Sequence, residues 1–116
     1  MMPKPKRGEV WLVRFPFTDL TSTKLRPSLV VAIHGEDVIV VGIFSRISTG
    51  TLRKTWVRID DQHSAFRQTG LKKASLLRAE KVTIVHESVF QQKLGKLPLD
   101  LMAEVQVALK RALLLS

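Results

Sequence analysis

Short apolar segments with an alternating pattern, separated by polar turn residues, fill the first three quarters of the chain. Residues 9–15 alternate between two faces, and residues 55–59 do the same. Residues 27–33 and 37–44 are rich in valine and isoleucine, and His34-Gly35-Glu36 between them predicts a hairpin turn. Such segments constrain the chain to short antiparallel strands, which must curl or pair to hide their edges.

Two further short strands are predicted near residues 74–77 and 82–85. Polar composition predicts a loop at 18–24 and an irregular segment at 60–70. The chain is therefore expected to contain five or six short strands.

The C-terminal part changes to a helical period. Pro98 and Asp100 suit the first turn of a helix, where a fixed φ and a negative charge are favourable. Lys110 and Arg111 suit its last turns. Apolar residues form one stripe at positions 101, 102, 105, 108, 109, 112 and 113. We expect a mainly β fold, namely a small curled antiparallel barrel with one helix packed against it.

The charge of the chain is strongly positive. Nineteen Lys and Arg against ten Asp and Glu leave a net charge of +9 over 116 residues, which are enough for a single domain. This balance favours a polyanionic partner such as nucleic acid, although a solvated basic surface or a patch that meets an acidic protein has the same composition. The sequence has no cysteine, which excludes disulfides and thiolate metal sites.

Several common functional motifs are missing from the sequence. His34, His63 and His86 lie far apart without a metal-ligand spacing, and no glycine-rich nucleotide loop is present. Asp60-Asp61 is interpreted as a turn rather than a metal pair. We therefore expect no metal and no cofactor. Residues 1–10 lack the apolar core of a secretory signal, and no apolar run approaches the ~20 residues of a membrane span, which predicts a soluble, cytoplasmic protein.

Arginines at predicted strand ends are the remaining candidates for chemistry. A guanidinium presents a planar fork of donors that matches phosphate oxygens. Strand ends of a small barrel face one another, so these side chains could form one cationic groove, or they could be solvated or paired with Asp19, Glu36 or Asp60. The strand-end arginines are Arg14, Arg26 and Arg46, and Lys24, Arg53, Lys54, Ser45, Ser48, Thr49 and Thr51 lie in the adjoining loops.

Several segments resemble the MazF/PemK family of type II toxin–antitoxin toxins. RGEVWLVRFPFTD (7–19) resembles the first strand and loop of that family, and KLRPSLVVA (24–32) resembles its arginine–proline signature. DVIVVGIFSRI (37–47) is similar to its third strand. The segments 70–85 and 93–113 resemble its final strands and helix.

The resemblance implies an SH3-like barrel of the MazF/PemK/CcdB toxin type with a C-terminal helix, usually as a homodimer. It also implies a metal-independent, sequence-specific endoribonuclease that cleaves single-stranded RNA by attack of a 2′-OH on the adjacent phosphate. A cognate antitoxin, expected to be acidic with a disordered tail, would neutralise it. A catalytically weakened nucleic-acid-binding member of the fold and a gyrase-directed toxin are the alternatives.

The resemblance also implies site residues. Arg26 matches the catalytic arginine of the family. The second catalytic residue of the family is a threonine in an Ile-Thr-Ser-Arg motif, where this chain has Ile43-Phe44-Ser45-Arg46. Ser45 is therefore the expected hydroxyl donor. The residues expected to contact RNA are Arg14, Thr18, Lys24, Phe44, Arg46, Thr49, Arg53 and Lys54.

Overall fold

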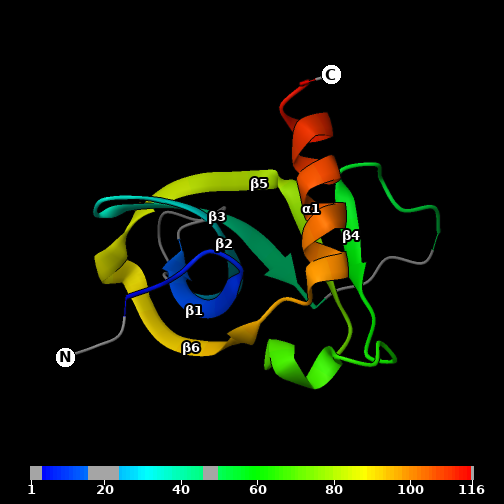
Figure 1. The fold of residues 1–116 in the computed structure, drawn as a ribbon, viewed down its shortest axis with the longest axis horizontal. Coiled ribbons are helices and arrows are strands. Elements are labelled where there is room, and N and C mark those ends of the chain that lie inside the picture. The colour runs from blue at the N-terminus through cyan, green and yellow to red at the C-terminus, as the bar shows by residue number, and fades with distance from the viewer. Residues whose placement is uncertain (1–3, 16–23, 46–49, 116) are drawn as a thin grey trace.

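Antiparallel pairing joins every strand of the described chain into one curled sheet (Figure 1). The computed structural model describes residues 4–15, 24–45 and 50–115. These residues form six strands in the spatial order β4-β5-β3-β2-β1-β6, followed by one α-helix, which confirms the predicted fold class. The elements are β1 (Glu9–Phe15), β2 (Lys24–His34), β3 (Asp37–Phe44), β4 (Trp56–Ile59), η1 (Phe66–Thr69), β5 (Ser75–His86), η2 (Glu87–Val89), β6 (Phe90–Lys96) and α1 (Leu99–Ala112).

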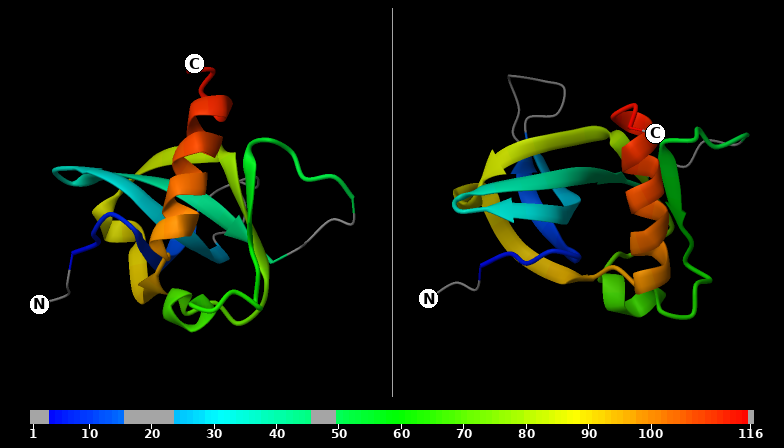
Figure 2. Two further views of the ribbon diagram at one scale, coloured as in Figure 1. Left: turned by 45° about the vertical axis from the view of Figure 1, so that its right-hand side comes forward. Right: turned by 45° about the horizontal axis from the view of Figure 1, so that its top comes forward.

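The first half of the sheet follows the predicted strands closely. β1 and β3 have the predicted bounds, and β2 is longer than the predicted strand by residues at both ends. His34 pairs with Asp37 across the predicted hairpin turn, in which Gly35 has a φ of 62°. The β2–β3 hairpin reaches away from α1 (Figure 2).

The second half of the sheet corrects two predictions. One long strand, β5, replaces the two short strands predicted at 74–77 and 82–85. Its pairing to β3 shifts register between Val41 and Ile43, and the strand bends at this irregularity. Charged residues at 78, 80 and 81 interrupt the apolar pattern of the strand, which is why the sequence predicted two short strands. β6 was not predicted, because its sequence FQQKLGK is mostly polar. A polar sequence suits the edge of a sheet, where β6 lies.

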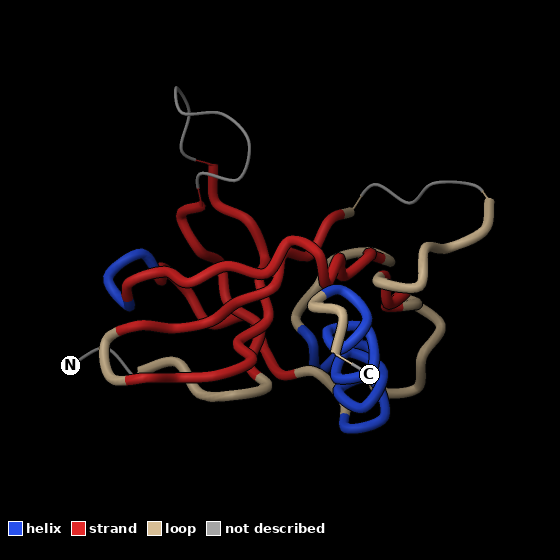
Figure 3. Tube along the Cα trace, turned by 90° about the horizontal axis from the view of Figure 1, so that it is seen from above, coloured by secondary structure: helices blue, strands red, loops and turns tan. Residues whose placement is uncertain are grey.

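Two apolar clusters lie on opposite faces of the sheet. Alternate residues of β1 enter each cluster, since Val10 belongs to the first and Trp11 and Val13 belong to the second. Helix α1 covers the first cluster through Leu101, Val105 and other buried residues. Seen from above, α1 lies at the opposite end of the molecule from the β2–β3 hairpin (Figure 3). No helix in the described ranges is long and apolar enough to cross a bilayer.

Two glycines bring η1 against β6. Gly70 ends η1 with a φ of 73°, in the left-handed region that glycine adopts readily. A Cβ on Gly95 of β6 would overlap the backbone of Gln68 and Thr69, and a Cβ on Gly70 would overlap the backbone of Leu94. The backbones of η1 and β6 therefore lie too close together for a side chain at Gly70 or Gly95.

Glu9 is a buried carboxylate that ties the start of β1 to β6. It accepts hydrogen bonds from the backbone N–H of Lys6 at 2.8 Å and from the indole of Trp11 at 3.0 Å, and it forms an ion pair with Lys93 at 2.8 Å. Burial raises the pKa of Glu9, but the bonds from Lys93, Trp11 and Lys6 outweigh it and leave the pKa below its ordinary value of 4.5.

We expect Glu9→Gln to lower the free energy of unfolding by about 1–2 kcal/mol at pH 7, because the charge-assisted bonds are weakened. A carboxyl whose pKa is lower in the folded state stabilises the fold above its unfolded pKa and loses this effect as the pH falls through its folded pKa. The difference between wild type and variant should therefore be smaller at pH 3 than at pH 7. Urea unfolding at both pH values checks this, and an equal difference at both would contradict it.

Candidate functional site

Arg26 lies on β2, opposite Val13 of β1. Pro27 follows it and disfavours helical backbone at Arg26, which suits an extended strand. Ser28 pairs with Gly42 across β2 and β3, so continuing this register brings Arg26 beside Phe44. The guanidinium carbon of Arg26 lies 5.4 Å from the centroid of the Phe44 ring.

Arg26 and Ser45 line one cavity of about 360 Å³. Ser45 follows the last residue of β3 and is exposed. Lys72 and Lys73, which precede β5, line the same cavity, and none of the described lining residues is acidic. The remaining lining residues are Leu12, Leu25, Pro27, Ile43, Leu71, Ser75 and Leu94. Three cations and two hydroxyl side chains, on a described lining that is otherwise apolar, give this cavity the chemistry that suits an anion.

None of the other predicted residues that the structure describes is among the lining residues of this cavity. Arg14 and Lys24 are exposed at the same end of the β1–β2 pair as Arg26. Arg53 contacts the ring of Trp56, and Lys54 lies beside α1, where its carbonyl accepts a hydrogen bond from Arg111 at 3.3 Å. Thr18, Arg46 and Thr49 lie outside the described residues.

A second set of cation–ring contacts continues from Phe44 and was not predicted from the sequence. The guanidinium carbon of Arg78 lies 5.4 Å from the Phe44 ring centroid and 5.1 Å from that of Trp56. Arg53 lies 5.3 Å from the Trp56 ring. The split prediction of β5 placed Arg78 between two strands, which hid its alternation with the rest of β5.

Glu80 holds this second set in place. Its carboxylate accepts hydrogen bonds from Thr55 at 2.9 Å, from the Trp56 indole at 2.8 Å and from Arg78 at 3.0 Å. Burial raises the pKa of Glu80, but the bonds from Trp56, Thr55 and Arg78 outweigh it, so the pKa lies below its ordinary value. The carboxylate is therefore charged at neutral pH, and it orients the Trp56 indole and the Arg78 guanidinium.

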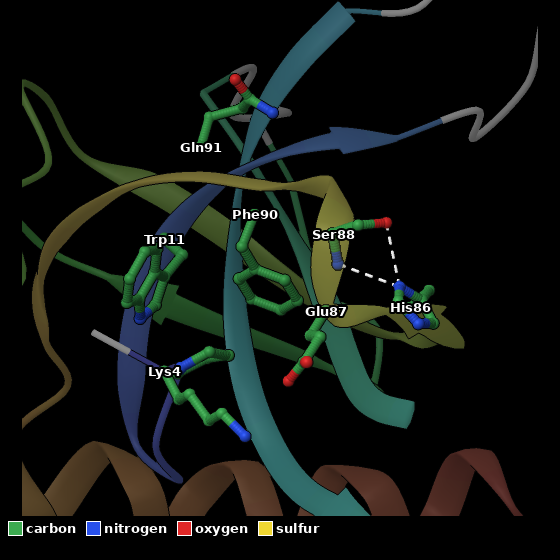
Figure 4. Close-up of a pocket in the computed structure, with 8 residues that line it drawn as sticks. Lys4, Trp11, His86, Glu87, Ser88, Phe90 and Gln91 are labelled. Carbon is green, nitrogen blue, oxygen red and sulfur yellow. Dashed lines mark hydrogen bonds between the residues drawn. The ribbon is translucent and has the colours of Figure 1, made fainter. Parts of the chain in front are cut away.

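A separate cavity of about 410 Å³ lies against Trp11 and Phe90 and contains none of the predicted residues (Figure 4). The two rings meet edge to face, with centroids 5.7 Å apart. The backbone N–H of Ser88 donates to Nδ1 of His86 at 3.1 Å, and Nε2 of His86 lies 3.2 Å from Glu36. Lys4 and Glu87 bring opposite charges to the cavity, so it lacks the excess of cations found around Arg26.

Acidic and histidine side chains meet in pairs, such as His63 with Asp100 and His86 with Glu36. Within residues 4–15, 24–45 and 50–115, no group of three or more such side chains could hold a metal ion. The polar side chains described around the Arg26 cavity carry guanidinium, ammonium and hydroxyl groups.

Comparison with known families assigns the chain. The family model described as PemK-like, MazF-like toxin of type II toxin–antitoxin system matches residues 6–113. The chain belongs to this family. The match confirms the resemblance of the sequence motifs and covers nearly the whole chain, from before β1 to the end of α1. A comparison with curated protein sequences gives no match.

Solved structures of the PemK/MazF family share the fold at low sequence identity. An endoribonuclease from a mycobacterial species, in complex with its cognate antitoxin, is 21% identical over 97% of both chains, with a TM-score of 0.72. The Mycobacterium tuberculosis toxin MazF-mt6 is 17% identical over 93% of this chain and 98% of its own, with a TM-score of 0.73. MazF from Deinococcus radiodurans is 22% identical over 97% of this chain and 98% of its own, with a TM-score of 0.71.

Proposed function

We propose that this PemK/MazF toxin is a metal-independent endoribonuclease that cleaves single-stranded RNA in a sequence-specific way. The observation that carries the proposal is the cavity that Arg26, Lys72 and Lys73 line together with Ser45, with no acidic side chain among its described lining residues. Family membership supports it, and a structural relative is an endoribonuclease bound to its antitoxin. The net charge of +9 favours a polyanionic substrate.

The proposed reaction needs only cations and donors around one phosphate. The ribose 2′-oxygen forms a bond to the adjacent phosphorus as its proton leaves, and the bond from phosphorus to the 5′-oxygen breaks as that oxygen takes a proton. The products are a 2′,3′-cyclic phosphate and a free 5′-OH. Arg26 stabilises the charge that develops on the phosphate oxygens, and Ser45 donates a hydrogen bond to one of them.

Incubation of the purified protein with a long single-stranded RNA in EDTA tests the proposal. We expect cuts at a recurrent sequence that leave 5′-OH ends. The 5′ ends are identified by their labelling with kinase without prior phosphatase treatment. A folded protein that leaves every RNA intact would refute the nuclease proposal.

Phe44 supports a second candidate, a binder of single-stranded nucleic acid with weakened catalysis. The aromatic ring stands where the family motif has a threonine hydroxyl, and two guanidiniums contact it. A ring at this position can stack on a base but cannot donate a hydrogen bond to a phosphate oxygen.

We expect Phe44→Thr to raise the rate of RNA cleavage about tenfold, because it restores a hydrogen-bond donor beside Arg26. Single-turnover cleavage rates of variant and wild type measure the effect. Phe44→Val is the matched control, because valine has nearly the same shape as threonine but lacks its hydroxyl. An equal change in both variants would show that the hydroxyl plays no part.

We propose a cognate antitoxin as the protein partner of this chain and a homodimer as its oligomeric state. The excess of Lys and Arg suits an acidic segment that folds on binding and competes with RNA. Structural relatives bound to antitoxins support this partner. An acidic peptide that leaves RNA binding unchanged at saturating concentration would argue against the competition.

A further inference from the structure

Four residues from four neighbouring strands form a row across the sheet. Their strands follow one another in the order β2, β3, β5 and β4. Phe44 pairs with Leu76, two residues before Arg78 on β5, and the Arg78 guanidinium reaches the Phe44 ring across this diagonal. Trp56 pairs directly with Arg78 in the register of β4 and β5. Since adjacent strands lie about 4.8 Å apart, the row from Arg26 to Trp56 is about 14 Å long.

Cations and rings alternate along this row. Arg26 and Arg78 reach the ring of Phe44 from the strands on either side of β3, each at 5.4 Å. Arg78 also lies over Trp56, and Arg53 extends the row at 5.3 Å from that ring. We call these five side chains the arginine–aromatic row: Arg26, Phe44, Arg78, Trp56 and Arg53.

The arginine–aromatic row is ordered but accessible. Glu80 binds both Arg78 and the Trp56 indole, so neither side chain rotates freely. The side chain of Arg78 is still 30% exposed, and Phe44 and Trp56 are half-buried. Three arginines against one glutamate leave a positive surface. Ordered rings and guanidinium planes on a positive surface are the means by which proteins bind single strands, because every base has a stacking face.

We propose that the arginine–aromatic row is the surface on which bases of single-stranded RNA stack, with Arg78 and Trp56 as RNA-contacting residues. This inference rests on the proposed RNA cleavage, because the row begins at Arg26. The row would lead the RNA away from the cleavage cavity towards β4. A short run of nucleotides beside the phosphate held by Arg26 covers the row.

Trp56 provides a direct measurement. The chain has two tryptophans, and Trp11 is 2% exposed, so Trp11→Phe leaves Trp56 as the only indole. A 2′-O-methyl RNA lacks the attacking hydroxyl and reports binding without cleavage. We expect titration with this RNA to quench Trp56 fluorescence. Saturable binding by anisotropy without any change in Trp56 emission would overturn the proposal.

Substitution of Arg78 provides the second measurement. We expect Arg78→Ala to weaken binding of the 2′-O-methyl RNA about tenfold and Arg78→Lys to recover part of the loss, because lysine keeps the charge but not the plane. Arg67→Ala removes one charge from an exposed position in η1 and is the matched control. Equal losses in Arg78→Ala and Arg67→Ala would show that only net charge matters and would overturn the proposal.

The two proposals fail in different ways. Quenching of Trp56 without cleavage of native RNA contradicts the nuclease proposal alone. Cleavage of native RNA with unchanged Trp56 emission contradicts the row alone. If Arg78→Ala does not fold, as judged by circular dichroism, the quenching measurement on Trp11→Phe decides whether RNA binds the arginine–aromatic row.

Discussion

Arg26→Ala is expected to abolish RNA cleavage, with a loss of at least about 10³-fold in the single-turnover rate. Arg26 brings a permanent charge to the cavity that Ser45 lines, and its forked donors match two phosphate oxygens at once. Alanine leaves Lys72 and Lys73 to hold the phosphate, so RNA binding should weaken far less than cleavage. Parallel cleavage and anisotropy measurements with one RNA separate the two effects.

Two further variants show whether the loss belongs to the guanidinium. Arg26→Lys keeps the charge without the fork and should recover only a small part of the rate. Arg67→Ala should cleave at the rate of the wild type. If Arg26→Ala cuts RNA as fast as the wild type, the catalytic assignment is wrong.

Gly95→Ala is expected to cost about 3 kcal/mol of unfolding free energy. A methyl group at Gly95 meets the backbone carbonyl groups of η1, which cannot move aside as the end of a flexible side chain can. β6 or η1 must shift, and β6 is held in place by its antiparallel pairing to β1. Urea unfolding followed by circular dichroism measures the loss.

Gly35→Ala is the matched control for this effect. Gly35 has a φ of 62°, and no atom lies within 4 Å of the position that its Cβ would take. Its substitution adds only the strain of the left-handed backbone, about 1 kcal/mol. If Gly95→Ala loses no more stability than Gly35→Ala, the close approach of β6 to η1 does not have the expected effect.

The parts of the fold that local pattern determines were predicted from the sequence. β1 and β3 alternate cleanly, and the turn around Gly35 is a local signal. β5 and β6 were misjudged because charged and polar side chains on them are stabilised by distant partners. Glu80, for example, meets Thr55 and Trp56 from another strand, and a single-sequence pattern does not contain such pairs.

The candidate site shows the same limit. Arg26 and Phe44 were found from motifs, and the register of β2 and β3 explains why they meet. Arg78 was missed because its place depends on the long, bent β5. Lys72 and Lys73 were visible as a basic pair, but only the fold brings them to the cavity of Arg26.

The position of β1 between β2 and β6 has a consequence for the newly made chain. Pairing of Glu9 with Lys96 joins segments from opposite ends of the sequence, a slow, non-local step. A nascent chain that ends before β5 has Arg26 and Phe44 but neither Arg78 nor the strand that follows Lys72 and Lys73. The cavity of Arg26 is therefore completed late in synthesis, because Ser75 of β5 and Leu94 of β6 also line it.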